Sequence, residues 1–192
     1  MPDHYLDWPQ ADSRTSQRSL SPRFFGKYRG VVVSNDDPQD LGRLQVRVPA
    51  VLGDAQAVWA LPCVPYAGAG VGFYALPEPG TNLWVEFEAG DPSSAIWAGC
   101  FWGSGELPHG DGAPVKIWKT AMGTIRIDDN AGEILIETSG GAKITLKSDA
   151  VTEAGGGKHT VGAAGVVSEK GAGKVEVLDA AVKMNGTGLV VT

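Results

Sequence analysis

Long apolar runs are missing from this 192-residue chain, and so are long windows free of helix breakers. No run approaches the roughly 18 apolar residues that a membrane-spanning helix needs. The N-terminal residues also lack the basic start and apolar core of a secretory signal. Because 27 glycines and 12 prolines interrupt nearly every stretch, helices are disfavoured. We therefore predict an all-β protein of short strands and tight turns.

Positive charge is missing from residues 48–112, which contain no Lys or Arg, and the net charge of the whole chain is −6. Proteins that bind DNA or RNA neutralise phosphates with a clustered basic surface. The segment that holds most of the aromatic residues is acidic instead. We therefore expect no nucleic-acid partner.

Cysteine is rare, and both cysteines stand in apolar segments, at Cys63 and Cys100. A thiol in apolar sequence behaves as a small hydrophobic residue. We therefore predict two buried, reduced thiols rather than a disulfide, as in a reducing compartment.

Patterns that catalysis or metal binding requires are also scarce. The histidines, His4, His109 and His159, are isolated in the sequence and lack metal-ligand spacing. Glu86 and Glu88 lie two apart on one face of a predicted strand. We interpret this pair as a solvated face or a subunit contact, because nothing around it resembles a substrate cleft. We predict that the protein is not an enzyme and holds no cofactor or metal.

Strand patterns begin after a polar arm at residues 1–22, which holds too little apolar surface to order itself. Tyr5 and Trp8 are its candidate anchors on a partner. Residues 23–103 then show five apolar segments that predict strands, at 25–34, 43–49, 57–64, 82–89 and 95–102. Five strands in about 80 residues suit a small closed barrel of the OB kind.

Two of these predicted strands alternate so that apolar residues share one face. The shared-face residues are Leu44, Val46 and Val48 in the first, and Leu83, Val85, Phe87 and Ala89 in the second.

Residues 104–114 are rich in Gly and Pro and predict a linker, after which residues 115–192 hold only short apolar segments. No Phe, Tyr or Trp follows Trp118. Strands are predicted at 124–127, 134–136, 144–146, 175–177, 182–184 and 189–191, and the glycine-rich runs 155–157 and 162–173 predict tight turns. Such small units cannot bury their apolar faces alone.

Three copies wound around one axis would bury these faces, because each apolar residue would meet its counterparts and strand edges would pair between chains. With about eight strand layers at roughly 4.8 Å each, this prism would be of order 40 Å long. The predicted trimer core consists of Ile125, Ile127, Ile134, Ile136, Ile144, Leu146, Val175, Val177, Val182 and Met184.

Two blocks of sequence resemble the OB domain of phage baseplate assembly protein V and VgrG-type spike proteins. The first block comprises residues 30–35, 37–38, 41–46 and 48–49, and the second comprises 79–80, 85–92 and 96–99. Further on, residues 124–129, 133–138 and 144–146 are similar to the start of the triple-stranded β-helix that follows in that family.

The resemblance implies an OB-fold barrel followed by a trimeric β-helix needle, which together form the membrane-piercing central spike of a contractile injection system. It implies a separate hub protein, placed here at Tyr5 and Trp8, because the hub region of VgrG proteins is absent ahead of the barrel. The target membrane would be contacted only transiently. Assembly in the bacterial cytoplasm is implied, as part of a virion or an extracellular phage-tail-like particle. A PAAR-type tip protein would contact the C-terminal residues Leu189, Val190, Val191 and Thr192.

Two other functions stay open. An OB-fold binding module would hold a sugar or single-stranded nucleic acid on Trp59, Trp84 and Trp97, although nucleic acid would also require a basic groove. A glycan hydrolase would use Glu86 and Glu88. Within the spike interpretation, the missing hub region argues against a type VI system, and a phage tail and an extracellular particle are not separated.

Overall fold

The structure is a computed structural model that describes residues 22–108, 110–185 and 190–191. It divides into two compact units, with the boundary between Gly105 and Glu106. The predicted all-β class is confirmed, since the only helical segments among the described residues are α1 (Pro49–Leu52) and the 3₁₀ turn η1 (Glu88–Gly90). No helix in this part of the chain has the length and apolar character needed to cross a membrane.

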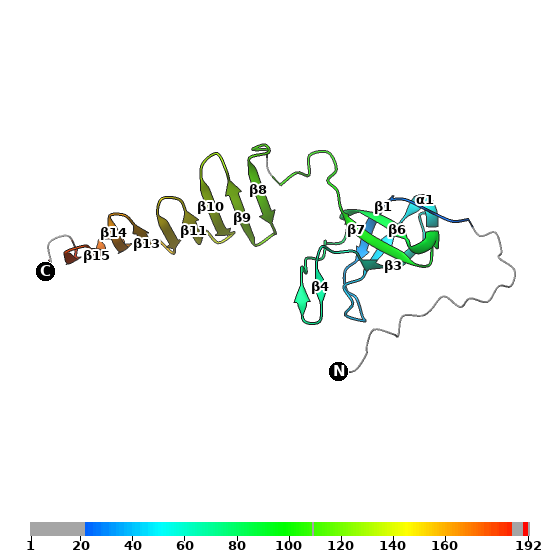
Figure 1. Ribbon diagram of the computed structural model, residues 1–192, viewed down its shortest axis with the longest axis horizontal. Helices are drawn as coiled ribbons and strands as arrows, with labels where there is room; N and C mark the ends of the chain where they lie inside the picture. The colour runs from blue at the N-terminus through cyan, green and yellow to red at the C-terminus, as the bar shows by residue number, and fades with distance from the viewer. Residues whose placement is uncertain (1–21, 109, 186–189, 192) are drawn as a thin grey trace. The chain divides into compact units, whose positions relative to one another are not determined.

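The first unit is built around a closed barrel of five strands in the order β1-β2-β3-β7-β6 (Figure 1). Strands β3 and β7 pair in parallel, and the other neighbours pair antiparallel. This closure matches the predicted OB fold. A separate hairpin of β4 (Ala67–Gly68) and β5 (Val71–Gly72) leaves the barrel between β3 and β6. The barrel strands are β1 (Tyr28–Ser34), β2 (Leu44–Arg47), β3 (Ala57–Pro62), β6 (Asn82–Phe87) and β7 (Ala95–Cys100).

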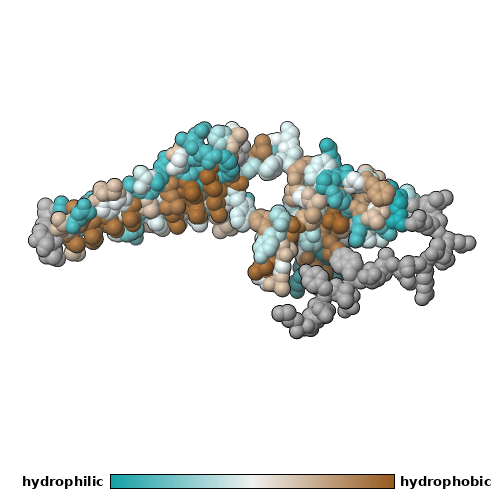
Figure 2. All heavy atoms as spheres, viewed as in Figure 1, coloured by the Kyte–Doolittle hydropathy of each residue, from teal (hydrophilic) through white to brown (hydrophobic). Residues whose placement is uncertain are grey.

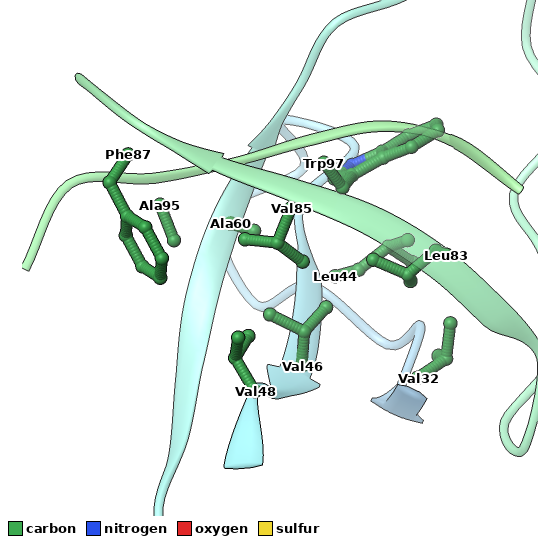
Figure 3. Close-up of a cluster of buried hydrophobic side chains, with 10 residues drawn as sticks. All are labelled: Val32, Leu44, Val46, Val48, Ala60, Leu83, Val85, Phe87, Ala95 and Trp97. Atoms are coloured by element: carbon green, nitrogen blue, oxygen red, sulfur yellow. The ribbon is translucent and has the colours of Figure 1, made fainter. Parts of the chain in front are cut away.

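The barrel interior is filled by the side chains that alternate along its strands (Figure 3). The predicted apolar face of β2 is confirmed, and so is that of β6 as far as Phe87. Ala89 does not share that face, because the strand ends at Phe87 and Ala89 lies exposed in η1 with φ of 49°. The buried cluster comprises Val32, Leu44, Val46, Val48, Ala60, Leu83, Val85, Phe87, Ala95 and Trp97.

Two further expectations for this unit are wrong. The strand predicted over 43–49 ends at Arg47, because Pro49 opens the helical turn α1, where the fixed φ of proline is favoured. Cys63 and Cys100 form no disulfide, as expected, but both are exposed rather than buried. Cys63 follows the last residue of β3 and Cys100 is the last residue of β7, so both lie where strands leave the barrel.

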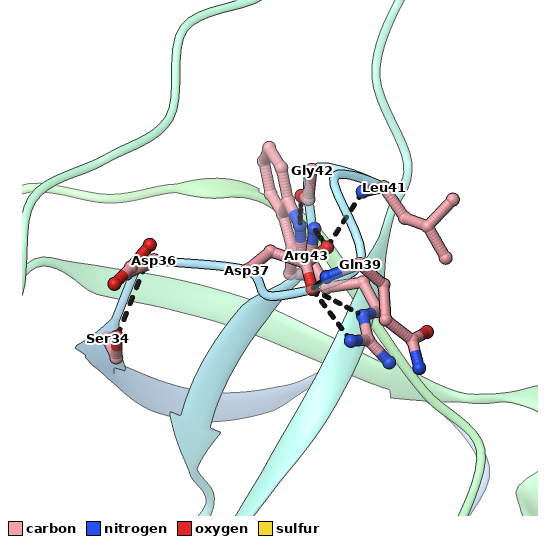
Figure 4. Close-up of polar contacts among 8 residues, drawn as sticks. Ser34, Asp36, Asp37, Gln39, Leu41, Gly42 and Arg43 are labelled. Carbon is pink, nitrogen blue, oxygen red and sulfur yellow. Dashed lines mark hydrogen bonds and ion pairs between the residues drawn. The ribbon is translucent and has the colours of Figure 1, made fainter.

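The loop between β1 and β2 is organised by the carboxylate of Asp37 (Figure 4). This carboxylate accepts hydrogen bonds from the backbone N–H groups of Gln39, Leu41 and Arg43 at 2.9 to 3.1 Å. The Arg43 guanidinium adds an ion pair at 2.7 Å, in which the side chains are 16% (Arg43) and 4% (Asp37) exposed. The hydrogen bonds from Arg43 and the loop backbone hold the pKa of Asp37 far below its ordinary value, although burial opposes them.

We expect acid to destabilise the first unit partly through Asp37. Because its pKa is lower in the folded unit than in the unfolded chain, the carboxylate stabilises the fold fully above about pH 4, the ordinary carboxyl value, and loses this effect as the pH falls further. Asp37→Asn should lower the melting temperature at neutral pH and weaken its decline in acid. Melting curves recorded across this pH range would test this, with a change of the exposed Asp36, Asp36→Asn, as the control. The assignment would be contradicted if both variants behaved like the wild type.

The second unit is one antiparallel sheet of ten strands, in which each strand pairs with the next in the chain (Figure 1). In a single copy it is therefore a meander, and the intertwined trimeric helix remains a prediction. At roughly 4.8 Å per strand, the sheet extends of order 45 Å. Its strands are β8 (Val115–Lys119), β9 (Gly123–Asp128), β10 (Glu133–Thr138), β11 (Lys143–Leu146), β12 (Ala150–Ala154), β13 (Gly157–Gly162), β14 (Gly165–Lys170), β15 (Gly173–Leu178), β16 (Ala181–Met184) and β17 (Val190–Val191).

Six strands of this sheet were predicted, and β8, β12, β13 and β14 were not. The glycine-rich runs are not only turns, because Gly157 and Gly173 begin strands and Gly162 ends one. Alternation continues through these strands, but polar residues occupy some of the positions that Ile and Val occupy elsewhere. Hydrophobic periodicity therefore weakens there, while the strand pairing does not.

Candidate functional site: the apolar face of the C-terminal sheet

All ten residues predicted to form the trimer core lie on one face of the C-terminal sheet. Side chains alternate between the faces of a strand, so cross-strand partners share a face. One row of partners runs Ile127, Ile134, Leu146, Ala150, Val161, Val166, Val177 and Val182. The neighbouring row runs Ile125, Ile136, Ile144, Thr152, His159, Ser168, Val175 and Met184. We call these two rows the apolar face.

Nothing in the described chain covers this face. The ten predicted core residues are 36% to 46% exposed, whereas the barrel core of the first unit is almost completely buried. Figure 2 shows hydrophobic side chains gathered along one side of the sheet, with hydrophilic ones along the other. Contiguous exposed apolar surface of this kind marks an interaction site.

The opposite face carries an alternating row of charges, which we call the charge ladder. The four inner residues of this row each stand between two opposite charges across the strands, and the two terminal residues each face one. Opposite charges directly across antiparallel strands are favourable, and like charges are not. The charge ladder comprises Glu137, Lys143, Glu153, Lys158, Glu169 and Lys174.

The protonation equilibria follow this arrangement. Lys143 Nζ lies 2.7 Å from a carboxylate oxygen of Glu153. Their hydrogen bond raises the pKa of Lys143, and the negative charge of Glu137 raises it further. The same hydrogen bond lowers the pKa of Glu153, and the positive charge of Lys158 lowers it further. At the far end, the hydrogen bond that Lys174 donates to the carboxylate of Glu176 raises the pKa of Lys174, and the charge of Glu169 raises it further. Lys143, Glu153 and Lys174 therefore remain ionised around neutral pH.

The two faces together specify the pairing register. A slip by one residue would turn isoleucines toward the charged side and charges toward the apolar side. A slip by two would keep the faces but break the alternation of the charge ladder. The sheet is therefore built with one face for water and one for burial.

We expect Lys158→Glu to destabilise the C-terminal sheet, because it places three negative charges side by side with Glu153 and Glu169. The loss in melting temperature should shrink at high salt, which screens exposed charges. Lys119→Glu is the matched control, since its cross-strand partner is Thr124. Reversing all six charges should restore the wild-type melting temperature; a full reversal as unstable as the single change would refute this account of the register.

The other candidate residues are not assembled into a catalytic site. Glu86 forms an ion pair with Lys27, and Glu88 lies in η1 rather than on the strand. Within the described residues of one chain, no three His, Cys, Asp or Glu side chains are grouped to hold a metal ion. The acid/base pair of the hydrolase alternative is therefore divided between a strand and a turn.

The three tryptophans of the binding-module alternative do not form one platform. Trp97 is part of the barrel core, and its indole N–H donates to the carbonyl of Gly42 at 3.3 Å. The Arg43 guanidinium lies 5.0 Å from the ring centroid of Trp59. The ring centroids of Trp84 and Phe101 lie 4.8 Å apart. Each indole is thus already engaged within the unit.

Several predicted contact residues fall outside what the structure describes. Tyr5 and Trp8 of the predicted hub contact lie outside the described residues, as do Leu189 and Thr192 of the predicted tip contact. The backbone of Val190 and Val191 forms β17, which pairs with β16. These contacts therefore stay predictions.

Residues 28–102 match the family of the type VI secretion system/phage-baseplate injector OB domain. The barrel is therefore similar to the OB domains of these injectors. The match covers the five barrel strands and the β4–β5 hairpin, and it confirms the resemblance seen in the sequence. The family is one of structural baseplate domains, and the match supports a structural baseplate role for this part of the chain. No curated protein matches the chain.

Proposed function

We propose that this protein is the structural, membrane-piercing central spike of a contractile injection system baseplate, and that it is not an enzyme. One observation carries the proposal: an injector OB domain is followed by a sheet whose apolar face has no cover in its own chain. The force would come from the contracting machine. The spike would contribute stiffness and a piercing shape.

Three copies meeting at their apolar faces would form a closed prism, with the charge ladder of each copy outside. The strands are short, at two to six residues, so the space enclosed by three sheets would be filled by the two apolar rows of each. Fully burying an Ile, Leu or Val side chain contributes about 1.5–3 kcal/mol, so burying what remains exposed of ten such residues would contribute on the order of 10 kcal/mol per chain. Because no strand edge would run free along the prism, it would resist unfolding strand by strand.

The partners follow from this arrangement. The homotrimer would meet a hub protein through Tyr5 and Trp8 at its N-terminal side. It would meet a PAAR-type tip protein through residues 189–192. Assembly would take place in the bacterial cytoplasm, and the product would be a virion or an extracellular phage-tail-like particle whose contact with the target membrane is transient.

The mass of the particle in solution tests the proposal most directly. Light scattering behind a sizing column should give about 60 kDa for the full chain, three times its 20.0 kDa. A version that stops at Gly105, the end of the first unit, should be monomeric because it lacks the apolar face. A full-length mass of one chain with a folded C-terminal sheet would instead favour the OB-fold binding module.

A charge placed on the apolar face should prevent assembly. Ile144→Asp would bring three carboxylates together in the prism, each costing several kcal/mol unless paired, so we expect the trimer to be lost. Thr145→Asp is the matched control, because it lies next in the chain but on the charged side. Trimers of unchanged mass and melting temperature with Ile144→Asp would contradict the shared core.

A further inference from the structure

A second exposed apolar surface lies on the first unit, around the β4–β5 hairpin. Leu41, Tyr66, Val71 and Tyr74 are between 53% and 78% exposed, and they line one depression together with the hairpin backbone. Figure 1 shows this hairpin standing away from the five barrel strands. Tyrosines are enriched where proteins meet other proteins, and exposed apolar surface of this kind marks an interaction site. We call these four residues the hairpin patch.

The rim of the hairpin patch is acidic. Asp40 lines the same depression, and Asp36 lines an adjoining one that shares residues with it. Both residues are exposed, and neither carboxylate forms an ion pair among the described residues. No Lys or Arg occurs from residue 48 to 112, and the nearby Arg43 is already paired with Asp37. A partner of the hairpin patch should therefore present positive charge around an apolar surface.

The outward side of β1 and β2 has this complementary character, and we call it the arginine flank. Arg29 and Arg47 are exposed there beside Val31 and Val33, and Arg47 stands directly across from Val31. Neither strand contains Asp or Glu. Neither guanidinium forms an ion pair among the described residues. The arginine flank therefore offers positive charge around two valines.

We propose that the hairpin patch of one copy docks on the arginine flank of the next copy, so that Asp36 and Asp40 face Arg29 and Arg47. The proposal rests on the proposed trimer, which it extends from the C-terminal sheet to the barrels. Because the two surfaces differ, the contact is heterologous. A three-fold axis closes such a contact into a ring, in which every copy supplies one hairpin patch and receives another.

The polar arm ahead of the barrel fits the hairpin patch less well than a second copy does. Residues 1–12 of the arm contain Asp3, Asp7 and Asp12 and no Lys or Arg. The acidic rim would therefore repel the part of the arm that holds its aromatic residues, since like charges across an interface are unfavourable.

The contact is also too small to assemble the barrels by itself. Four exposed side chains cover much less than the roughly 800 Å² that each partner buries in a stable interface. The contact would form between copies that the C-terminal sheets already hold together, at an effective concentration on the order of millimolar. A chain that lacks the C-terminal sheet would therefore stay monomeric.

Zero-length cross-linking of the full-length protein tests this contact. Arg47→Lys places an amine on the arginine flank, and a carbodiimide joins an amine to a carboxylate that it touches. Peptide mass spectrometry should find the introduced amine linked to Asp36 or Asp40, and denaturing gels should show that the link joins two chains. Ser94→Lys is the matched control, because its amine would lie in the exposed turn between β6 and β7 and should not form this link.

Two further changes, each combined with Arg47→Lys, locate the contact. Tyr74→Ala should lower the yield of the link by about fivefold or more, because a tyrosine within a contact carries much of its binding energy. The mass of the trimer should not change. Ile144→Asp, which we expect to be monomeric, should give no link at the same chain concentration.

The remaining outcomes separate this inference from the proposed function. A trimer in which the introduced amine is linked to neither Asp36 nor Asp40 of another chain would overturn the ring of barrels and leave the spike in place. A link to Asp3, Asp7 or Asp12 would assign the arginine flank to the arm and overturn the ring as well. A protein of one-chain mass under all conditions would overturn both the trimer and the ring.

Discussion

The structure of the second unit depends on strict two-residue alternation held in register across ten strands. Each strand contributes only a few apolar side chains, and none of these is buried by the strand itself. Pairing in register adds them into two continuous rows, while the charged residues are collected on the other side. The apolar face is therefore a property of the whole sheet, and a single slipped hairpin would divide it.

The two units meet the same physical requirement in different ways. In the barrel, the sheet closes on itself, so that Leu44, Val46 and Leu83 are completely removed from solvent. The C-terminal sheet does not close, because its end strands β8 and β17 do not pair with each other. Its apolar residues stay about 40% exposed in a single copy. The barrel therefore completes its core alone, whereas no described residue of the same chain covers the apolar face of the second unit.

Much of this organisation could be predicted from the sequence, because large apolar residues reveal alternation wherever they occur. The barrel strands and β9, β10 and β11 were found in this way. The end of β6 before Ala89 was missed, because an alanine continues an apolar pattern whether or not the backbone has turned. The exposure of Cys63 and Cys100 was missed for a related reason, since apolar neighbours in sequence do not show where a strand leaves the barrel.

Strands β12 to β14 were missed because one position of each on the apolar face holds a polar residue, Thr152, His159 or Ser168, which carries no hydrophobic signal. The alternating signs of the charge ladder were a second signal, present in the sequence at Glu153, Lys158 and Glu169. Each of these residues is one step in a regular cross-strand series, and a search for alternating charge at strand spacing would have found them.

Three polar residues on the apolar face, Thr152, His159 and Ser168, also bear on how three chains would align. An apolar face of Ile and Val alone would allow one copy to slide along another by a strand spacing at little cost, since one apolar level resembles the next. The polar residues Thr152, His159 and Ser168 limit this freedom, because a slide that carries them beyond their own three strands would place them against isoleucine, valine or methionine of another copy. Buried polar residues set register and copy number in this way in coiled coils, at some cost in stability. In the proposed trimer, the interruption of the apolar face would therefore keep the three chains level while an axial force acts on them.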